Sequence, residues 1–479
     1  MIGRQGNAIA ASAELIPSVR WALAGLSLSM LLSSLGTSVA NVALPTLAQV
    51  FTASFQDVQW VVLAYLLAIT TLIVSAGRLG DMIGRRRLLV AGLFLFTVAS
   101  VLCGAASTLW LLAGARAVQG LGAAIMMALT MAFVSEIAPK ERTGSAMGLL
   151  GTMSAIGTAL GPSLGGILIA GLGWRSIFLV NLPLGMLALL LAHRYLPADR
   201  RMPTADRAGF DHAGTLALAL TLAAYALAMT IGRGSFGPLN IALLLAALFG
   251  VGLFVLAQRR AASPLFRLAM FRDPVLSANL AINLLVATVM MATLVVGPFY
   301  LSRALGLDEA LVGTVMSIGP IVSTLSGIPA GRIVDRLGAP FMIIVGLIQM
   351  AAGAFALSMI PAMFSIAGYI AAIVILTPGY QLFQAANNTA VMMGVDSDQR
   401  GVVSGMLNLS RNLGLITGAS AMGAVFALAS GAIDIATARP DAIATGMRTT
   451  FGVAAALMVG ALVIAIGSRV LARRYSNAA

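Results

Sequence analysis

Long apolar segments constrain this chain more than any other feature of its sequence. A helix needs about 20 predominantly apolar residues to cross the hydrocarbon core of a bilayer, and fourteen segments meet this requirement. The segments are too long, and alternate too little, to be strands of a membrane β-barrel. We therefore expect an all-α integral membrane protein. The expected helices are residues 20–44, 57–77, 88–106, 109–135, 143–171, 177–197, 211–231, 238–258, 275–302, 309–331, 339–360, 364–392, 401–430 and 444–470.

The composition and the placement of charge agree with this prediction. Hydrophobic residues make up 59% of the 479 residues and charged residues only 9%, which is far from the composition of a soluble domain. With fourteen helices, 22 of the 29 basic residues fall on the face that carries both termini. The positive-inside rule then places both termini in the cytoplasm. The net charge of +13 is spread over several loops, so it does not indicate a nucleic-acid partner.

Catalytic, metal and cofactor sites find no support in the sequence. Both histidines lie near expected helix ends, and no hydrolase, zinc-protease or nucleotide-binding motif is present. The single cysteine, Cys103, lies in an apolar run and predicts neither a disulfide nor a thiolate metal site. We therefore expect no enzyme activity, no metal and no cofactor. Any energy for transport has to come from a gradient.

One loop motif occurs twice. GRLGDMIGRRR (Gly77–Arg87) follows the second expected helix, and GRIVDRLG (Gly331–Gly338) follows the tenth. The glycines permit a tight turn, and the acid, Asp81 or Asp335, can cap a helix or pair with nearby arginines. The copies are eight helices apart, which predicts two six-helix bundles (1–198 and 263–479) separated by a linker and two inserted helices (199–262). Such internal repeats are typical of secondary transporters, which bind substrate near the midplane.

Further motifs point to one family. They are RAVQGLGAA (116–124), GTALGPSLGG (157–166), WRSIFLVNLP (174–183) and NLSRNLG (408–414). With the repeated loop, they make the chain from about residue 30 to 430 resemble the major facilitator superfamily, and within it the fourteen-helix drug:proton antiporter branch. The resemblance implies a monomeric exporter in the bacterial inner membrane, working by alternating access. Amphipathic small molecules, the lipid bilayer and, where transport is coupled, protons would be its partners.

The motifs supply candidate gating residues. Gly157, Gly161 and Gly165 share one helix face, which lets another backbone approach closely, and Pro162 favours a bend. This groove can serve simple helix packing or form an outer gate, and the resemblance to exporters favours the gate. The loop motifs supply the candidates for an inner gate, namely Gly77, Asp81, Gly84, Arg85, Gly331 and Asp335.

Polar residues at membrane depth supply candidate cavity residues. Arg116 and Arg411 lie roughly 10 and 15 Å inside their expected helices, where a lone guanidinium costs about 2.5–3.5 kcal/mol. Arg116 can bond to carbonyls of the first helix with help from Gln119, or it can tune a proton site or hold an anionic substrate. The amides can join helices or line a cavity. The full set is Asn41, Arg116, Gln119, Tyr380, Gln381, Gln384, Asn388, Asn408 and Arg411.

An acid is missing from the first helix. Members of the branch that the chain resembles usually carry an aspartate just before the threonine of the stretch LGTSVANVALP, where this chain has Gly36. All 16 acids fall in loops or near helix ends. A buried carboxylate is the usual titrating group and the natural partner of a lipophilic cation. The sequence therefore favours neutral or anionic substrates over cationic drugs.

Proton coupling remains open at this point. The candidates are Asp57, Asp81 and Arg116, and the resemblance suggests that the last of these takes part in coupling. The alternatives are an uncoupled uniporter or exchanger, and a membrane sensor or scaffold that does not transport.

Overall fold

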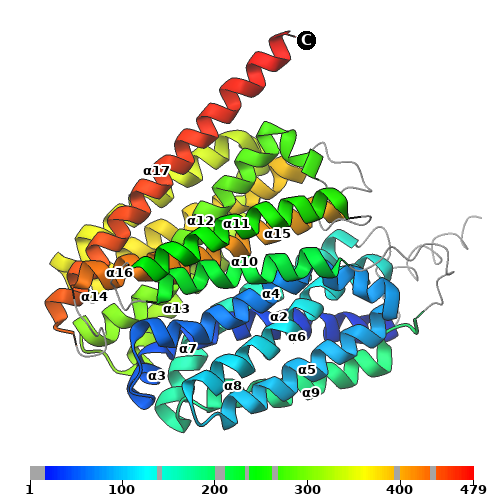
Figure 1. The fold of residues 1–479 in the computed structure, drawn as a ribbon, viewed down its shortest axis with the longest axis horizontal. Coiled ribbons are helices and arrows are strands. Elements are labelled where there is room, and N and C mark those ends of the chain that lie inside the picture. Colours follow the sequence, from blue (N-terminus) through cyan, green and yellow to red (C-terminus); the bar gives the residue numbers. More distant parts are fainter. Residues whose placement is uncertain are drawn as a thin grey trace, which may run out of the picture.

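The computed structural model describes residues 17–137, 143–199, 211–231, 237–261, 268–392, 400–431 and 438–478. Throughout these ranges the regular elements are helices, and 14 of them are long and apolar enough to cross a membrane. The prediction of an all-α membrane protein with fourteen helices of membrane-spanning length and hydrophobicity is thereby confirmed. Figure 1 shows that these helices run side by side along a common direction.

We divide the helices into three groups by chain order. The N-terminal group comprises α2 (Pro17–Val42), α3 (Leu44–Val50), α4 (Phe55–Ile83), α5 (Arg85–Ala105), α6 (Leu109–Ile137), α7 (Thr143–Leu172), α8 (Ser176–Leu179) and α9 (Asn181–Tyr195). The inserted pair is α10 (His212–Thr230) and α11 (Pro238–Arg260). The C-terminal group comprises η3 (Leu268–Arg272), α12 (Pro274–Phe299), η4 (Tyr300–Ala304), α13 (Glu309–Leu337), α14 (Ala339–Met392), α15 (Arg400–Thr417), η5 (Gly418–Met422), α16 (Gly423–Ser430) and α17 (Pro440–Ala478).

Four of these elements depart from regular α-helix, and one of them is η3, a short 3₁₀ helix. The element α14 contains two spans, because Ser365 breaks the helical backbone with a φ of 52°. The segments η4 and η5 are π-helical turns that continue α12 and α15. Such turns release backbone groups from the regular ladder and are frequent at functional sites.

The molecule has two faces that the helix directions define. Helix α2 begins and α17 ends on the same side, at the right of Figure 1, which we call the terminal face. The other side carries α3 and the connection between η4 and α13, and we call it the opposite face.

Glycines repeat the same packing in both groups. In the N-terminal group, Gly157 of α7 lies against the carbonyl of Leu31 in α2, and Gly161 lies against Ser38. In the C-terminal group, Gly414 and Gly418 keep the same four-residue spacing and lie against the carbonyls of Leu284 and Thr288 in α12. Small residues let helix backbones approach in this way. The two groups are therefore built on equivalent helix contacts.

The repeated loops form turns, but at other glycines than the first of each motif. Gly77 and Gly331 lie inside α4 and α13, so these helices continue beyond the ends expected from the sequence. The turns are made by Gly84 and Gly338, whose φ values of 111° and 86° favour glycine. Asp81 and Asp335 accordingly lie in the last turns of α4 and α13 and do not begin the next helices.

A different acid, Asp199, caps α5, the helix that follows the turn at Gly84. Its carboxylate accepts hydrogen bonds from the backbone nitrogens of Arg86 (2.7 Å) and Arg87 (3.2 Å), at the start of α5. A carboxylate there satisfies unpaired backbone donors and complements the helix dipole. No local signal around residue 199 indicated this contact.

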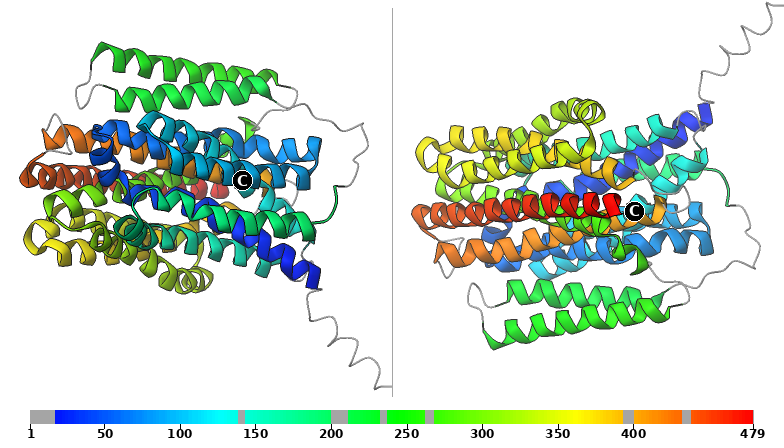
Figure 2. Two further views of the ribbon diagram at one scale, coloured as in Figure 1. Left: turned by 90° about the horizontal axis from the view of Figure 1, so that it is seen from below. Right: turned by 90° about the horizontal axis from the view of Figure 1, so that it is seen from above.

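The inserted pair packs on one side of the bundle, as Figure 2 shows. The inner helix of the pair, α10, contacts the N-terminal group through hydrogen bonds of Thr215 with Ser75 (3.0 Å) and of Thr230 with Trp60 (3.1 Å). It also contacts the C-terminal group, because Tyr225 approaches the hydroxyls of Thr417 and Ser420. The outer helix, α11, leaves most of its large apolar side chains exposed.

Candidate functional site

Arg116 lies at the centre of a buried polar network in the N-terminal group. It is the largest fully buried side chain in the described part of the chain. Its Nε donates to the carbonyl of Val61 in α4 (2.9 Å), and Nη2 donates to the carbonyl of Gly36 in α2 (2.9 Å). Its Nη1 donates to the Gln119 side chain (2.5 Å). The guanidinium therefore ties three helices together through neutral acceptors.

Neighbouring side chains complete this network. The Gln119 amide donates to Ser100 of α5 (2.7 Å), so the contacts extend to a fourth helix. The Tyr65 ring lies 4.0 Å below the Arg116 guanidinium, and its hydroxyl donates to the carbonyl of Ser33 (2.8 Å). Cation–π contacts of this kind are strongest when they are desolvated. Each of the three guanidinium nitrogens of Arg116 thus donates a hydrogen bond, and none of the acceptors is a carboxylate.

The described residues of the C-terminal group contain no counterpart of this network. Gly92 packs against Gly122 between α5 and α6, and Gly346 packs against Gly379 within α14 in the same way. Counting back from Gly122 and Gly379 by the same number of residues brings Arg116 and Gln119 onto Ile373 and Leu376. A charged network in one repeat is replaced by apolar side chains in the other.

Gly36 allows Tyr65 and Arg116 to take these positions. A Cβ atom on Gly36 would lie 2.9 Å from the Tyr65 hydroxyl and 3.4 Å from the Phe96 ring. The Gly36 carbonyl is at the same time an acceptor of Arg116. The glycine that replaces the usual acid therefore lies directly beside the buried arginine.

The two groups meet at the opposite face through a pair of glycines. A Cβ built on Gly166 of α7 would lie 2.9 Å from the Cα of Gly313 in α13, and one built on Gly313 would lie 2.6 Å from the carbonyl of Pro162. Two helix backbones are thus in direct contact across the groups. The other motif glycines, Gly157, Gly161 and Gly165, face α2 within their own group. No sequence motif surrounds Gly313, so the sequence did not indicate its role in this contact.

Aromatic and amide side chains extend this junction. The Phe55 ring packs edge-on against Phe299 (4.8 Å between centroids) and Phe426 (5.3 Å), which belong to the C-terminal group. The Gln59 amide donates to the carbonyl of Ala419 (2.7 Å), which lies in the π-helical turn η5. The contact therefore uses the irregular backbone of α15 as an acceptor.

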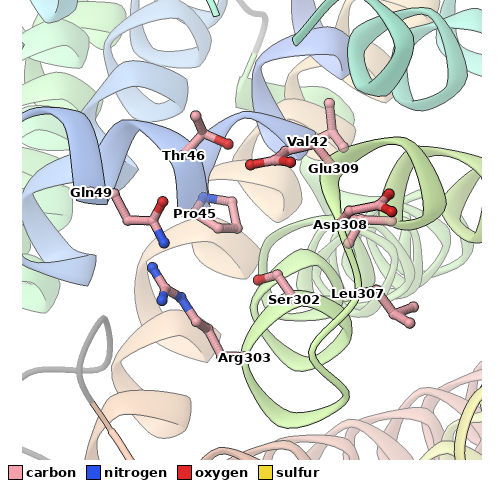
Figure 3. A pocket seen from close by; sticks show the side chains of 10 residues that line it. Val42, Pro45, Thr46, Gln49, Ser302, Arg303, Leu307, Asp308 and Glu309 are labelled. Atoms are coloured by element: carbon pink, nitrogen blue, oxygen red, sulfur yellow. The ribbon is translucent and has the colours of Figure 1, made fainter. Parts of the chain in front are cut away.

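A small pocket of about 100 Å³ lies at the rim of the same junction (Figure 3). It is lined by α2, α3, η4 and the start of α13. With the Gln49 amide oxygen turned toward Arg303, the Nη1 of that arginine donates to it at 3.0 Å. Asp308 caps α13 by accepting from the backbone nitrogen of Leu311 (2.8 Å). The pocket is too small for a drug-sized ligand, so we regard it as part of the closed junction.

The remaining candidates on α14 separate into different environments. Gln381 donates to the carbonyl of Ser323 in α13 (3.1 Å), which is a packing contact. Gln384 donates to the Tyr380 hydroxyl (3.2 Å), while Asn388 is exposed. The adjacent Asn387, which was not among the candidates, is fully buried, and both its amide atoms have no partner among the described residues.

We expect Asn387→Leu to raise the thermal stability of the purified protein and to lower its transport rate. A buried amide without partners costs about 1–3 kcal/mol, and an apolar side chain of similar size removes this cost. A helix retains such a group when another conformation or a bound substrate satisfies it. Melting temperature and flux are measured together, with Asn387→Asp as the polar control. An unchanged flux would contradict a role of Asn387 in transport.

The other predicted residues occupy distinct places. Asn41 is buried and donates to the carbonyl of Thr37 (3.0 Å), so it bonds within α2. Asp57 accepts from the Ser54 hydroxyl (2.6 Å) at the opposite-face end of α4. Asn408 and Arg411 are partly exposed on α15. The side chain of Asp81 lies outside the described residues.

Comparisons with known proteins agree with this architecture. A sequence model of the Major Facilitator Superfamily matches residues 26–419. The chain is 34% identical over 445 residues to the drug efflux pump JefA of Mycobacterium tuberculosis (89% of this chain, 85% of that one). It is 31% identical over 406 residues to the uncharacterized transporter YebQ of Escherichia coli (85% and 88%).

A second functional name occurs among the similar proteins. The riboflavin transporter RibZ of Clostridioides difficile is 30% identical over 402 residues (84% of this chain, 86% of that one). Among solved structures, a bacterial homolog of the human lysosomal transporter Spinster, in an inward-facing and occupied conformation, superposes with a TM-score of 0.70 at 16% identity (95% and 98%). This likeness concerns the fold alone.

Proposed function

The chain belongs to the major facilitator superfamily of transporters, and on that premise we propose that it exports amphipathic small molecules by alternating access. The observation that carries the proposal is the junction at the opposite face. Two helix groups built on equivalent glycine contacts touch backbone to backbone there, at Gly166 and Gly313. Rocking of one group against the other around a site near the midplane is the motion that repeated transporter folds use.

In this proposal the parts of the molecule have separate roles. Residues 1–198 and 263–479 are the two moving bundles, and 199–262 hold the inserted pair. The terminal face is cytoplasmic, as the basic residues indicate, and the protein is a monomer in the bacterial inner membrane. With this junction closed, we infer that the described state is the one open toward the cytoplasm. Asp81, Arg85 and Asp335 with their glycines form the gate on that side.

We further propose that export is coupled to proton entry, as the resemblance to the drug:proton antiporter branch suggests. The candidate groups are Asp57, Asp81 and the Arg116 network. The alternative is uncoupled uniport or exchange. It is favoured by the positions of the acids, because those on described helices lie in the first or last turn, as Asp57, Glu309 and Asp441 do. A buried carboxylate that titrates between the two sides is therefore missing from the described spans.

Proteoliposomes with an internal pH-sensitive dye test this proposal. Three probes are added in turn: riboflavin as a neutral compound, chosen because of the relative RibZ, an aromatic carboxylate and an aromatic quaternary ammonium. Movement of a probe together with protons supports the coupled exporter. Movement of a probe without protons supports the uncoupled alternative. If none of the three moves, while a known drug exporter in parallel vesicles moves its substrate, the transporter proposal fails.

We expect Gly36→Asp to make the ammonium probe drive proton movement that is absent in the wild-type protein. The new carboxylate would lie beside Arg116 and Tyr65 at membrane depth, where it can exchange a proton for a cation. The control is Gly36→Asn, which has the same size but does not titrate. Equal proton movement in the two variants would count against this explanation.

A further inference from the structure

The two arginines at membrane depth differ in how they are satisfied. Arg116 is fully buried, and its three nitrogens all have acceptors. Arg411 is partly exposed, and among the described residues its guanidinium has neither a hydrogen bond nor an ion pair. Because a guanidinium at this depth is costly, it needs water or an external partner. The difference marks Arg411 as the arginine that is available to a ligand.

The neighbours of α15 show which way Arg411 lies. Toward α12, Leu407 accepts from Asn283 (3.0 Å) and Gly414 touches Leu284. The contact with α10 is made at Thr417, and the contact with α4 is made beyond it, at Ala419. A helix turns by roughly 100° per residue. Arg411 therefore lies between the α12 side and the α4 side of its helix, and away from α10.

This sector lies toward the boundary between the two helix groups. Helix α4 belongs to the N-terminal group and α12 to the C-terminal group, while the inserted pair covers α15 from outside (Figure 2). Asn408, one turn before Arg411, lies on the same side of α15. Asn408 and Arg411 thus lie on the side of α15 toward this boundary. Arg411 is about 16 Å along the helix from its first residue.

The repeat shows that this charge is an addition to the common plan. Ser154 stands three residues before Gly157 in α7, as Arg411 stands three residues before Gly414. Ser154 pairs with the Ser34 hydroxyl (2.7 Å) across α2 and α7. The equivalent position in the N-terminal group therefore makes its helix contact without a charge. Packing of the helices therefore does not explain why an arginine occupies position 411.

We propose that Arg411 binds the anionic group of the transported compound, and that the substrates are amphipathic anions, such as carboxylates or sulfonates attached to an aromatic body. The proposal rests on the exporter function proposed above and names its substrate class. A guanidinium presents a planar pair of donors that fits a carboxylate or sulfonate. The described spans offer no midplane acid that would repel the anion or compete for the arginine.

Three matched fluorescent probes test this proposal on the full-length protein in proteoliposomes: a dansyl amino-acid carboxylate, its methyl ester and its quaternary ammonium analogue. We expect the wild-type protein to bind and carry the carboxylate at least tenfold better than the other two. Arg411→Gln should weaken carboxylate binding at least tenfold and change ester binding less than twofold. Arg411→Lys should restore part of the carboxylate binding, because it keeps the charge without the planar fork.

A variant at a surface arginine serves as the control for misfolding and for background binding. Arg439→Gln removes an exposed arginine that pairs with Asp441 at the opposite face, and it should leave all three probes unchanged. Equal losses for carboxylate and ester in Arg411→Gln, or no loss, would overturn the proposal. Preferential transport of the ester or the ammonium by the wild-type protein would also overturn it but would leave the exporter function standing. Failure of all three probes to bind or move would count against both proposals.

Discussion

Arg116→Met should destabilise the protein by about 1–3 kcal/mol, the cost of a buried acceptor left without a donor, and should lower flux more than tenfold. The substitution leaves the side-chain oxygen of Gln119 buried without its donor, while the Gly36 and Val61 carbonyls keep their helical hydrogen bonds within α2 and α4. A buried acceptor without a donor costs about 1–3 kcal/mol. The substitution also removes a side chain whose hydrogen bonds join α6 to α2 and α4. Thermal unfolding of the purified protein and flux in proteoliposomes measure the two effects.

The Arg116→Lys variant tests whether the hydrogen bonds of this side chain or its positive charge are needed. The lysine keeps the positive charge but donates from a single point, so it cannot reach three acceptors on different helices. If Arg116 serves coupling through its charge, the lysine variant should keep the pH dependence of the remaining flux. Arg175→Met is the matched control. Arg175 stacks on Trp174 and contacts Ala106 only at the long distance of 3.4 Å, so its loss should be mild. Wild-type stability of Arg116→Met would contradict the network's role.

The sequence was sufficient to predict the fourteen helices, because each is encoded by a long apolar run. The sequence also indicated the repeat, because tight turns and close contacts between helices require glycine at particular positions. It did not mark the ends of α4 and α13, since polar motif residues such as Asp81 can extend a helix at the membrane surface. Helix ends depend on capping contacts such as that of Asp199, which come from distant parts of the chain.

The candidate site was less accessible to sequence reasoning. Arg116 and Gln119 stood out because charge and amide groups are costly in lipid, and their spacing placed them on one helix side. The pairing of Gly166 with Gly313 was not predictable, because a small residue in a helix does not indicate which other helix will pack against it. Asn387 was likewise indistinguishable from its neighbours Gln384 and Asn388 in sequence. Only the packed arrangement shows that both amide atoms of Asn387 lack a partner among the described residues.

Gly166→Leu and Gly313→Leu should each lower flux more than tenfold while the protein still folds. The Gly166 and Gly313 backbones touch across the two helix groups, so a side chain at either position prevents the opposite face from closing. Packing inside each group is left intact, because the glycines facing α2 and α12 are unchanged. Gly171→Leu is the control on the same helix, since a Cβ there meets nothing within 4 Å.

Accessibility at the opposite face gives an independent measurement. In a Cys103→Ala background, a cysteine replacing the buried Val312 should react slowly with an impermeant maleimide in the otherwise unchanged protein. The Gly166→Leu change should increase this labelling several-fold, because the junction is held open. If flux falls while labelling remains low, the leucine has disturbed something other than closure. Wild-type flux in both leucine variants would show that the two groups need not meet at these glycines during the cycle.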